Sequence, residues 1–452
     1  MPRLSPEGNT TMGKYTKEDI IRIVQEEQIR FIRLQFTDIF GALKNVAITA
    51  SQLEKALSGQ IMLDGSSIEG FVRIEESDQY LRPDLDSFVI FPWNEGPGRI
   101  ARIICSVYNT DGTPFVGDPR NVLSRQVEAA AELGYTFNVG PECEFFLFQT
   151  EGRDRPAPND EAGYFDLNPG DTGEVVRREI CLALEEMGFE IEASHHETAP
   201  GQHEIDFKYA RAMHAADNIK TFELVVKSFA LRNKLYATFM PKPLFGVAGS
   251  GMHTNMSLFK DGKNAFYDPE GTYGLSKTAM SFIAGLMEHI RGLTAITNPL
   301  VNSYKRLVAG FEAPCYIAWS ATNRSALIRI PTARGNSTRI ELRSPDSACN
   351  PYLALACCLA AGLDGVRRNL TPPESVQQSI YDMTVAQRQA LGIGSLPATL
   401  EQAIGELQAD RLLMDTLGEH VSRAYIDGKK REWTEYCTAV TDWELKRYFY
   451  KY

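Results

Sequence analysis

Three short segments of the chain share one pattern, in which polar side chains alternate with apolar ones. Side chains two apart on a β-strand lie on the same face, so each segment would have a polar face and an apolar back. The polar positions are Glu142 and Glu144 in the first segment, His253, Asn255 and Ser257 in the second, and Arg339, Glu341 and Arg343 in the third. The solvated face of an ordinary antiparallel sheet explains any one of them. The three together predict a sheet whose polar face lines a site.

A fourth segment, residues 194–207, reads SHHETAPGQHEIDF and holds three histidines and three carboxylates. Its Ala-Pro-Gly turn separates Glu197 from Glu204, which predicts a hairpin that brings both carboxylates to one place. His195 and His196 are weaker candidates for the same site. For at least one of them, a buried structural histidine is the favoured interpretation.

The glutamates of these segments would repel one another at one place unless cations lay among them. Five glutamates and one histidine form an oxygen-rich donor set with a single imidazole, which suits Mg²⁺ or Mn²⁺ and not structural zinc. The donors are Glu142, Glu144, Glu197, Glu204, His253 and Glu341. The sequence therefore predicts a site for divalent metal ions.

Five arginines form a second group: Arg306, Arg324, Arg329, Arg339 and Arg343. Arginine makes planar, bidentate hydrogen bonds to phosphates and carboxylates, so several of them beside a metal cluster indicate a nucleoside triphosphate together with a small acid. Any one of them alone is more often a partner in a surface ion pair. The sequence has no G-x-x-x-x-G-K-[ST] motif, which excludes a P-loop.

The 452 residues are too many for one ordinary core and favour a small domain followed by a large one. Strand-like patterns at residues 30–36, 45–49, 88–93 and 101–108 predict a small β-rich domain, and the glycines and prolines of residues 109–121 indicate its boundary. Helical patterns at residues 121–134, 172–188 and 218–233 then alternate with strand-like runs. We therefore expect an α+β fold, with a flexible extension at residues 1–14 and domains at residues 15–112 and 120–452.

The composition argues against nucleic-acid and membrane partners. The net charge is −11, and no run of lysines and arginines forms a basic groove. Eight cysteines without a C-x-x-C pair indicate reduced thiols in the cytoplasm. The longest apolar run, residues 353–363, is shorter than the roughly 20 residues of a membrane helix, and we expect no secretion signal. The aromatic tail, residues 431–452, is expected to dock on its own core or on another subunit.

Seven motifs lie along the chain in an order that resembles the bacterial type I glutamine synthetases, in particular the shorter subtype of Gram-positive bacteria. They are LDGSSIEGF (63–71), PECEFFLF (141–148), SHHETAPGQHE (194–204), GSGMHTN (249–255), NSYKRLVAGFEAP (302–314), SATNRSALIRIP (320–331) and STRIELRSPDSACNPYLA (337–354). The resemblance implies ATP-dependent ligation of ammonium to L-glutamate through γ-glutamyl phosphate. It also implies a β-grasp N-terminal domain and a large catalytic domain, with an open β-barrel between adjacent subunits of a dodecamer of two hexameric rings.

The resemblance assigns roles to individual residues. It implies one metal ion at Glu144, Glu197 and Glu204 and another at Glu142, His253 and Glu341. It places ATP at Glu192, Ser257, Arg324, Arg329 and Arg339, and glutamate at Gly249, Arg306, Glu312, Arg324 and Arg343. Asp64 and Glu312 match the carboxylates of the ammonium site, which makes Asp64, Glu312 and Arg324 the candidate catalytic residues. Arg73 matches an arginine that relays feedback inhibition by glutamine.

Four positions depart from the family pattern. Ala248 replaces an asparagine that contacts glutamate, Cys143 and Ala309 replace prolines, and Asn336 replaces a lysine that contacts nucleotide in some relatives. The segment around Tyr381 resembles, without matching, the one that carries an adenylylated tyrosine in the longer subtype, so we expect feedback inhibition and no adenylylation. Transcription regulators of nitrogen metabolism are candidate partners.

Three other functions stay open at this point. A two-metal phosphohydrolase would use the same carboxylates and histidine but would need no ammonium pocket. A ligase that joins glutamate to a polyamine such as putrescine is a closer rival, and a non-catalytic nitrogen-sensing scaffold is the third. ADP release that requires both glutamate and ammonium, with glutamine as the product, would separate the expected activity from all of them.

Overall fold

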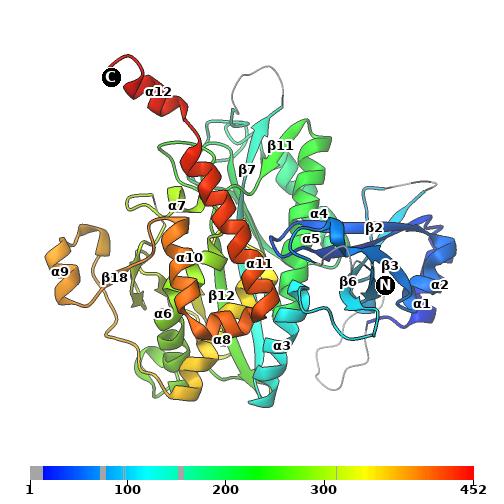
Figure 1. Ribbon diagram of the computed structural model, residues 1–452, viewed down its shortest axis with the longest axis horizontal. Coiled ribbons are helices and arrows are strands. Elements are labelled where there is room, and N and C mark those ends of the chain that lie inside the picture. Colours follow the sequence, from blue (N-terminus) through cyan, green and yellow to red (C-terminus); the bar gives the residue numbers. More distant parts are fainter. Residues whose placement is uncertain (1–13, 72–77, 95, 97, 151–156, 312) are drawn as a thin grey trace. The chain divides into compact units, whose positions relative to one another are not determined.

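The computed structural model describes residues 14–71, 78–94, 96, 98–150, 157–311 and 313–452 (Figure 1). Arg73, Glu312 and residues 1–13 of the expected extension lie outside this set. The chain divides into two compact units. The smaller unit takes its residues from Met1–Phe36, Leu43–Ile68 and Val72–Phe115, and the larger from Thr37–Ala42, Glu69–Phe71 and Val116–Tyr452. Two short segments of the N-terminal region therefore belong to the larger unit.

The smaller unit is built on a six-stranded sheet in the order β2-β1-β6-β4-β3, with β5 paired to β6. Its strands are β1 (Phe31–Thr37), β2 (Leu43–Thr49), β3 (Ile61–Asp64), β4 (Asp78–Pro83), β5 (Val89–Ile90) and β6 (Ile100–Asn109). β1 and β6 run parallel, whereas β4 pairs antiparallel with β6 and β3. The strands expected at residues 30–36, 45–49 and 101–108 are confirmed, but residues 88–93 form only the short strand β5.

Two helices of the smaller unit, α1 (Lys17–Glu26) and α2 (Leu53–Leu57), were not expected from the sequence pattern. α1 begins with a capping box, because the Thr16 hydroxyl accepts the Asp19 N–H and the Asp19 carboxylate accepts the Thr16 N–H. Ile20 and Val24 of this helix are buried. The capping motif in the sequence was therefore a usable signal for the helix.

The larger unit contains a ten-stranded sheet in the order β15-β16-β17-β12-β7-β9-β8, with β10 and β11 also paired to β7 and β13 paired to β12. Its strands are β7 (Thr136–Gln149), β8 (Ile191–His196), β9 (Gln202–Phe207), β10 (Ala210–Arg211), β11 (Leu235–Thr238), β12 (Met252–Lys260), β13 (Lys263–Asn264), β15 (Trp319–Ser320), β16 (Ile328–Arg329) and β17 (Ile340–Leu342). A separate ribbon joins β14 (Tyr316–Ile317) to β18 (Gly394–Ser395). β7 is the long central strand, and it runs antiparallel to β12 and β9.

Ten α-helices are described in the larger unit. They are α3 (Pro119–Glu132), α4 (Glu174–Glu186), α5 (Ala212–Arg232), α6 (Lys277–Thr297), α7 (Ser303–Arg306), α8 (Pro351–Arg368), α9 (Val385–Ala390), α10 (Leu400–Ala409), α11 (Arg411–Thr438) and α12 (Asp442–Tyr448). The helices expected at residues 121–134, 172–188 and 218–233 are confirmed as α3, α4 and α5. α3 and α5 pack on β7, and α8 packs on α6, α3 and α11.

The apolar run at residues 353–363 lies in α8, whose side chains are almost all buried in the core of the larger unit. Glycines let α8 approach α6 closely. A Cβ added to Gly285 would lie 2.2 Å from the carbonyl oxygen of Ala361, and one added to Gly365 would lie 2.0 Å from that of Ser281. Among the described residues, the helices are all too short or too polar to cross a membrane.

The aromatic tail does not dock on the core of its own unit. α12 follows the long helix α11 and projects at the red end of the chain (Figure 1). Trp443 is 61% exposed, Phe449 67% and Tyr450 97%. The expectation that this segment covers its own core is therefore wrong, and docking on another subunit stays a prediction.

Candidate metal and nucleotide site

Strand β7 carries the first pair of glutamates, and its two neighbours bring other polar side chains to it. Glu144 lies opposite Glu204 on β9, and Glu142 lies opposite His253 on β12. Cys143, between the two glutamates, alternates to the opposite face and is buried. The alternation predicted from the sequence is confirmed here, and the register of the sheet adds which side chains face each other.

The hairpin expected at residues 194–207 forms from β8 and β9, with His195 opposite Glu204. Its turn requires glycine at position 201, because Gly201 has φ +67° and a Cβ there would lie 2.8 Å from the carbonyl oxygen of Leu147. The side chains of His195, Glu197 and Glu204 offer ligand atoms within 4.8 Å of one another. His195 Nδ1 lies 3.5 Å from Glu197 Oε1, and Nε2 lies 4.0 Å from Glu204 Oε2. Burial lowers the pKa of His195, which favours a neutral imidazole able to bind a metal ion.

Glu144 faces this first cluster from β7. Its Oε2 accepts hydrogen bonds from Gln202 Nε2 at 2.7 Å and from the Gly251 N–H at 2.9 Å. Burial raises the pKa of Glu144, and burial together with the nearby Glu144 carboxylate raises the pKa of Glu204 far above its usual range. A divalent cation would replace the protons that these crowded carboxylates otherwise hold. The donor set therefore fits such an ion.

A second cluster joins Glu142, His253 and Glu341, whose ligand atoms also lie within 4.8 Å of one another. His253 Nδ1 lies 3.2 Å from Glu142 Oε2 and 3.8 Å from Glu341 Oε1. Burial raises the pKa of Glu142, but the hydrogen bonds from His253 and Asn255 and the electrostatic attraction of His253 and Arg329 together outweigh it and bring the pKa down to about 2. Glu341 is ion-paired with Arg329 and with Arg343, whose Nε lies 3.2 Å from Glu341 Oε1. The two carboxylates of this cluster thus lie beside His253 and two arginines.

A cavity of about 410 Å³ adjoins the second cluster and is bordered by Glu142. Three residues expected at the nucleotide also border it: Glu192, Ser257 and Arg339. Asn255 links the cavity to the metal cluster, because its Oδ1 accepts from Arg339 Nε at 3.0 Å and its Nδ2 donates to Glu142 Oε1 at 2.9 Å. The cavity has the size of a small-molecule site and presents both charges to it.

The residues expected to bind glutamate differ from one another in burial. Arg306 is 3% exposed, and its guanidinium donates to the carbonyl oxygens of Ser344 at 2.7 Å and Arg343 at 3.3 Å. Arg324 is exposed, and its carbonyl accepts from the Arg343 guanidinium. Gly249 must be glycine in this conformation, because a Cβ would lie 2.2 Å from the carbonyl oxygen of Pro241. Arg306 therefore shapes the backbone next to Glu144, whereas Arg324 is accessible.

The structure shows the neighbours of two more residues that depart from the family pattern, Ala248 and Asn336. Ala248 packs against the apolar cluster of Phe146 and Phe148. Asn336 borders the 410 Å³ cavity, where some relatives have a lysine, so its side chain brings no positive charge to that wall. Neither change disturbs the two metal clusters.

Asp64 belongs to the smaller unit, whereas both metal clusters belong to the larger unit. It ends β3 and caps the short 3₁₀ turn Gly65–Ser67. Its Oδ1 accepts from Ser66 Oγ at 2.6 Å and from the Ser66 N–H at 2.9 Å, and these bonds lower the pKa of this exposed carboxyl. Asp64 is therefore ionised and exposed at a fixed turn. Glu312 and Arg73, the other expected ammonium-site and feedback residues, lie outside the described residues.

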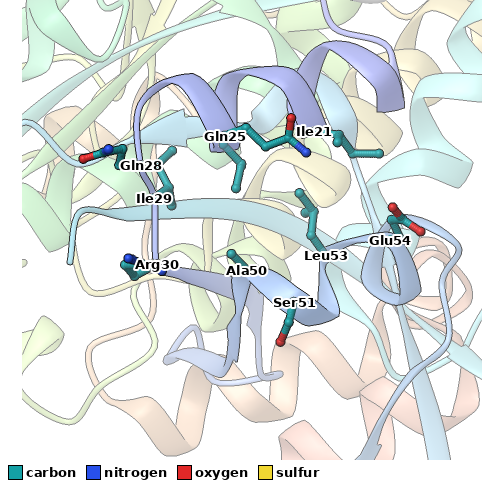
Figure 2. Close-up of a pocket in the computed structure, with 10 residues that line it drawn as sticks. Ile21, Gln25, Gln28, Ile29, Arg30, Ala50, Ser51, Leu53 and Glu54 are labelled. Carbon is teal, nitrogen blue, oxygen red and sulfur yellow. The ribbon is translucent and has the colours of Figure 1, made fainter. Parts of the chain in front are cut away.

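The smaller unit has a cavity of its own, of about 490 Å³ (Figure 2). It lies between α1 and the segment that leads into α2, and Figure 2 shows Ile21, Gln25 and Leu53 at its wall. None of the residues expected at the metal, the nucleotide or glutamate lines it. Of these two cavities, the one in the larger unit is the one bordered by residues expected at the metal and the nucleotide.

Sequence reasoning left out two side chains that the structure places in the site. Asp206 borders the 410 Å³ cavity opposite Glu142, and burial raises its pKa to about 7. Gln202 is 1% exposed and holds the Glu144 carboxylate. Both lie two positions from Glu204, so the alternation that grouped the glutamates would have found them on the same face.

Comparisons with known proteins agree with this geometry. Residues 116–448 match the family described as glutamine synthetase, catalytic domain, and residues 28–110 match glutamine synthetase, beta-Grasp domain. A glutamine synthetase of Clostridium saccharobutylicum is 63% identical over 443 residues, which cover 98% of this chain and 100% of that protein. A glutamine synthetase of Staphylococcus aureus (strain N315) is 58% identical over 441 residues, or 97% and 99% of the two chains.

Two solved structures share the fold. A GmaS/ADP complex superposes with a TM-score of 0.88 at 34% identity and covers 95% of this chain and 99% of its own. A glutamine synthetase of Plasmodium falciparum gives a TM-score of 0.87 at 24% identity and covers 97% and 100%. The expected β-grasp and catalytic domains are thereby confirmed, and with them a family that uses ATP and divalent metals and forms homo-oligomers. The chain belongs to the glutamine synthetase family, with Gram-positive relatives, and catalyses the ATP-dependent ligation of ammonium to L-glutamate.

Proposed function

We propose that the larger unit binds two divalent cations, Mg²⁺ or Mn²⁺, one at each acidic cluster. The first position is held by Glu144, Glu197 and Glu204, and the second by Glu142, His253 and Glu341. The observation that carries this proposal is that both clusters lie along neighbouring strands of one sheet, with the second at the border of the 410 Å³ cavity. His195 lies close enough to the first cluster to be an additional donor.

We propose that different sets of residues bind ATP and glutamate. We assign Glu192, Ser257, Arg324, Arg329 and Arg339 to ATP, and Gly249, Arg306, Glu312, Arg324 and Arg343 to glutamate. Arg324, which is exposed, is the side chain that would reach the phosphoryl group during its transfer. Bound metal ions would neutralise phosphate charge, so that the glutamate γ-carboxylate can attack and form γ-glutamyl phosphate.

Ammonium must lose a proton before it can attack the acyl phosphate. We assign Asp64 and Glu312 to this step, because a carboxylate attracts NH₄⁺ and can accept its proton. The hydrogen bonds from Ser66 keep Asp64 ionised, which supports the attraction. The loop that carries Glu312 would also keep water from the intermediate, since hydrolysis would waste it.

The wider assignments rest on the family resemblance. We propose cytoplasmic dodecamers of two hexameric rings, in which residues 15–112 and 120–452 act as the two functional domains. The exposed aromatic side chains of α12 support contact with another subunit. Arg73 is proposed to relay glutamine feedback, and nitrogen-regulatory transcription factors are proposed partners.

The test is an assay with ATP, glutamate and ammonium in the presence of Mg²⁺ or Mn²⁺, with mass detection of the product. We expect glutamine, with ADP release that requires both glutamate and ammonium. ADP release in the absence of ammonium would favour a phosphohydrolase, and preference for putrescine over ammonium would favour an amine ligase. Replacing Glu204 or His253 by alanine should abolish the metal-dependent product, and turnover in either variant would contradict the metal assignment.

A further inference from the structure

The β8–β9 hairpin has two faces, and only one of them belongs to the metal cluster. His195 and Glu204 pair on one face, and His196 and His203 pair on the other. The second pair is fully buried, with ring centroids 4.9 Å apart. Asp160 completes a third cluster of possible metal ligands with these two histidines.

Hydrogen bonds from an arginine show that this third cluster is complete without a metal ion. Arg177 of α4 donates from Nη1 to His203 Nδ1 at 2.8 Å, so that nitrogen is an acceptor already in use. The same guanidinium makes two bonds to Asp171, at 3.0 and 2.6 Å, and donates to Ser194 Oγ. Gly173 allows His203 this position, because a Cβ there would lie 2.4 Å from its ring. A cation beside the guanidinium would be repelled.

Asp160 ties together the two arms of the metal-bearing hairpin. Its Oδ1 accepts from His196 Nε2 on the β8 arm at 3.0 Å and from the Gly201 N–H at the β9 end of the turn at 3.1 Å. On its other side, His196 Nδ1 donates to the carbonyl oxygen of Glu197 at 2.6 Å. Oδ2 of Asp160 is anchored in turn by the Thr172 N–H at 3.1 Å. The His196 ring thus links the backbone carbonyl of Glu197 to the buried carboxylate of Asp160.

We propose that Asp160 and Arg177 are positioning residues of the first metal site, which hold the hairpin so that Glu197 and Glu204 converge before a cation binds. The inference rests on the proposed metal site. Wherever two of these three crowded carboxylates are ionised with no cation between them, their repulsion would push the turn away from β7. The buried network opposes that movement from the other face. Groups that orient metal ligands typically change metal affinity by about 10- to 100-fold when they are removed.

The test measures metal affinity directly, apart from catalysis. The full-length enzyme is stripped with EDTA and titrated with Mn²⁺, and the free ion is followed by its electron paramagnetic resonance signal. We expect Asp160→Ala to weaken one class of sites about tenfold and to leave the class that includes His253 unchanged. Asp160→Asn keeps one acceptor oxygen and should weaken the same class less. Asp364→Ala, which removes a carboxylate beside the remote His289, is the matched control and should leave both classes unchanged.

Three outcomes decide the matter. If Asp160→Ala lowers the melting temperature of the metal-free enzyme but leaves Mn²⁺ affinity unchanged, its role is structural only and the proposal is overturned. If this variant does not fold, Asp160→Asn and Arg177→Lys take its place, and unchanged affinity in both overturns the proposal equally. Glu204→Gln tests the proposed metal site apart from the positioning role. If this variant also leaves the Mn²⁺ affinity of both classes of sites unchanged, the assignment of the metal ligands is itself wrong.

Discussion

Glu341 and Glu142 belong to the same proposed metal position, yet their surroundings differ. The side chain of Glu341 is 1% exposed and is ion-paired with Arg329 and Arg343. The side chain of Glu142 is 27% exposed and contacts His253 and Asn255. We therefore expect Glu341→Ala to lower both stability and activity, and Glu142→Ala to lower activity with a much smaller loss of stability.

The size of the difference follows from burial. Removing one partner of a buried ion pair costs about 3–5 kcal/mol, because the remaining charge has no counter-ion. The side chains of Arg329 and Arg343 are 27% and 13% exposed and keep some hydration, so we take the lower bound for Glu341→Ala, about 3 kcal/mol. Loss of hydrogen bonds at the more exposed Glu142 should cost about 1 kcal/mol. At roughly 2 °C per kcal/mol for a unit of this size, the melting temperatures should fall by about 6 °C and 2 °C.

The assay combines thermal melting in EDTA with Mn²⁺-dependent glutamine formation. Glu190→Ala is the control, since Glu190 forms a surface ion pair with Lys208 and lies apart from the cluster. It should change neither measurement. Equal melting temperatures for the two cluster variants would refute the argument from burial, and Mn²⁺-dependent activity in Glu341→Ala would refute the assignment of Glu341 to the metal.

Three other predictions address different parts of the molecule. Burial opposes a charge on His289, but hydrogen bonds to Asp410 and Asp364 outweigh it and raise its pKa. A histidine with a raised pKa stabilises the fold at pH values below its pKa in the unfolded chain, about 6.5, and this contribution is lost as pH rises through the folded-state pKa. The melting temperature of wild type should therefore exceed that of His289→Gln at pH 6, and the two should converge by pH 9. The Tyr381 hydroxyl donates to the carbonyl oxygen of Ala313 at 2.8 Å, and Ala313 is next in sequence to Glu312. Tyr381→Phe should therefore lower kcat several-fold with unchanged Mn²⁺ affinity. An unchanged kcat would show that this hydrogen bond has no role in catalysis. Chains with Asp64→Ala and chains with Glu204→Ala should each be inactive alone. If sites are shared between subunits, verified mixed oligomers of the two should recover roughly a quarter of the activity. No recovery would show that each site lies within one chain.

The polar faces of the strands could be predicted because alternation is a local property of the sequence. Glu142, Glu144 and His253 needed only the two-residue period, and the β8–β9 hairpin needed only its turn. The order of the strands is not local, and sequence patterns alone did not indicate that β7 lies between β12 and β9. The registers that set Glu144 opposite Glu204 became visible only in the folded sheet.

The side chains that support the site were harder to predict. Asp160 lies in a loop and Arg177 on a helix with an ordinary apolar stripe, and neither position has a periodic signal. Their role depends on packing against His196 and His203, which the sequence showed only as histidines next to glutamates. Long-range contacts of this kind follow from tertiary structure, so no window of sequence contains them.

The two metal clusters balance the charge of their carboxylates in different ways. In the second cluster, Arg329 and Arg343 already lie beside Glu341 and offset its charge. In the first, the hydrogen bonds to Glu144 come from neutral groups, Arg306 lies nearby without forming an ion pair with it, and binding protons or a cation reduces the repulsion among the carboxylates. Among the described residues, no arginine or lysine forms an ion pair with the carboxylates of the first cluster, so a metal ion brings this cluster the larger electrostatic benefit, and its hairpin needs other contacts to hold its position before the ion binds. The bonds from Asp160 to both arms of the hairpin provide that restraint.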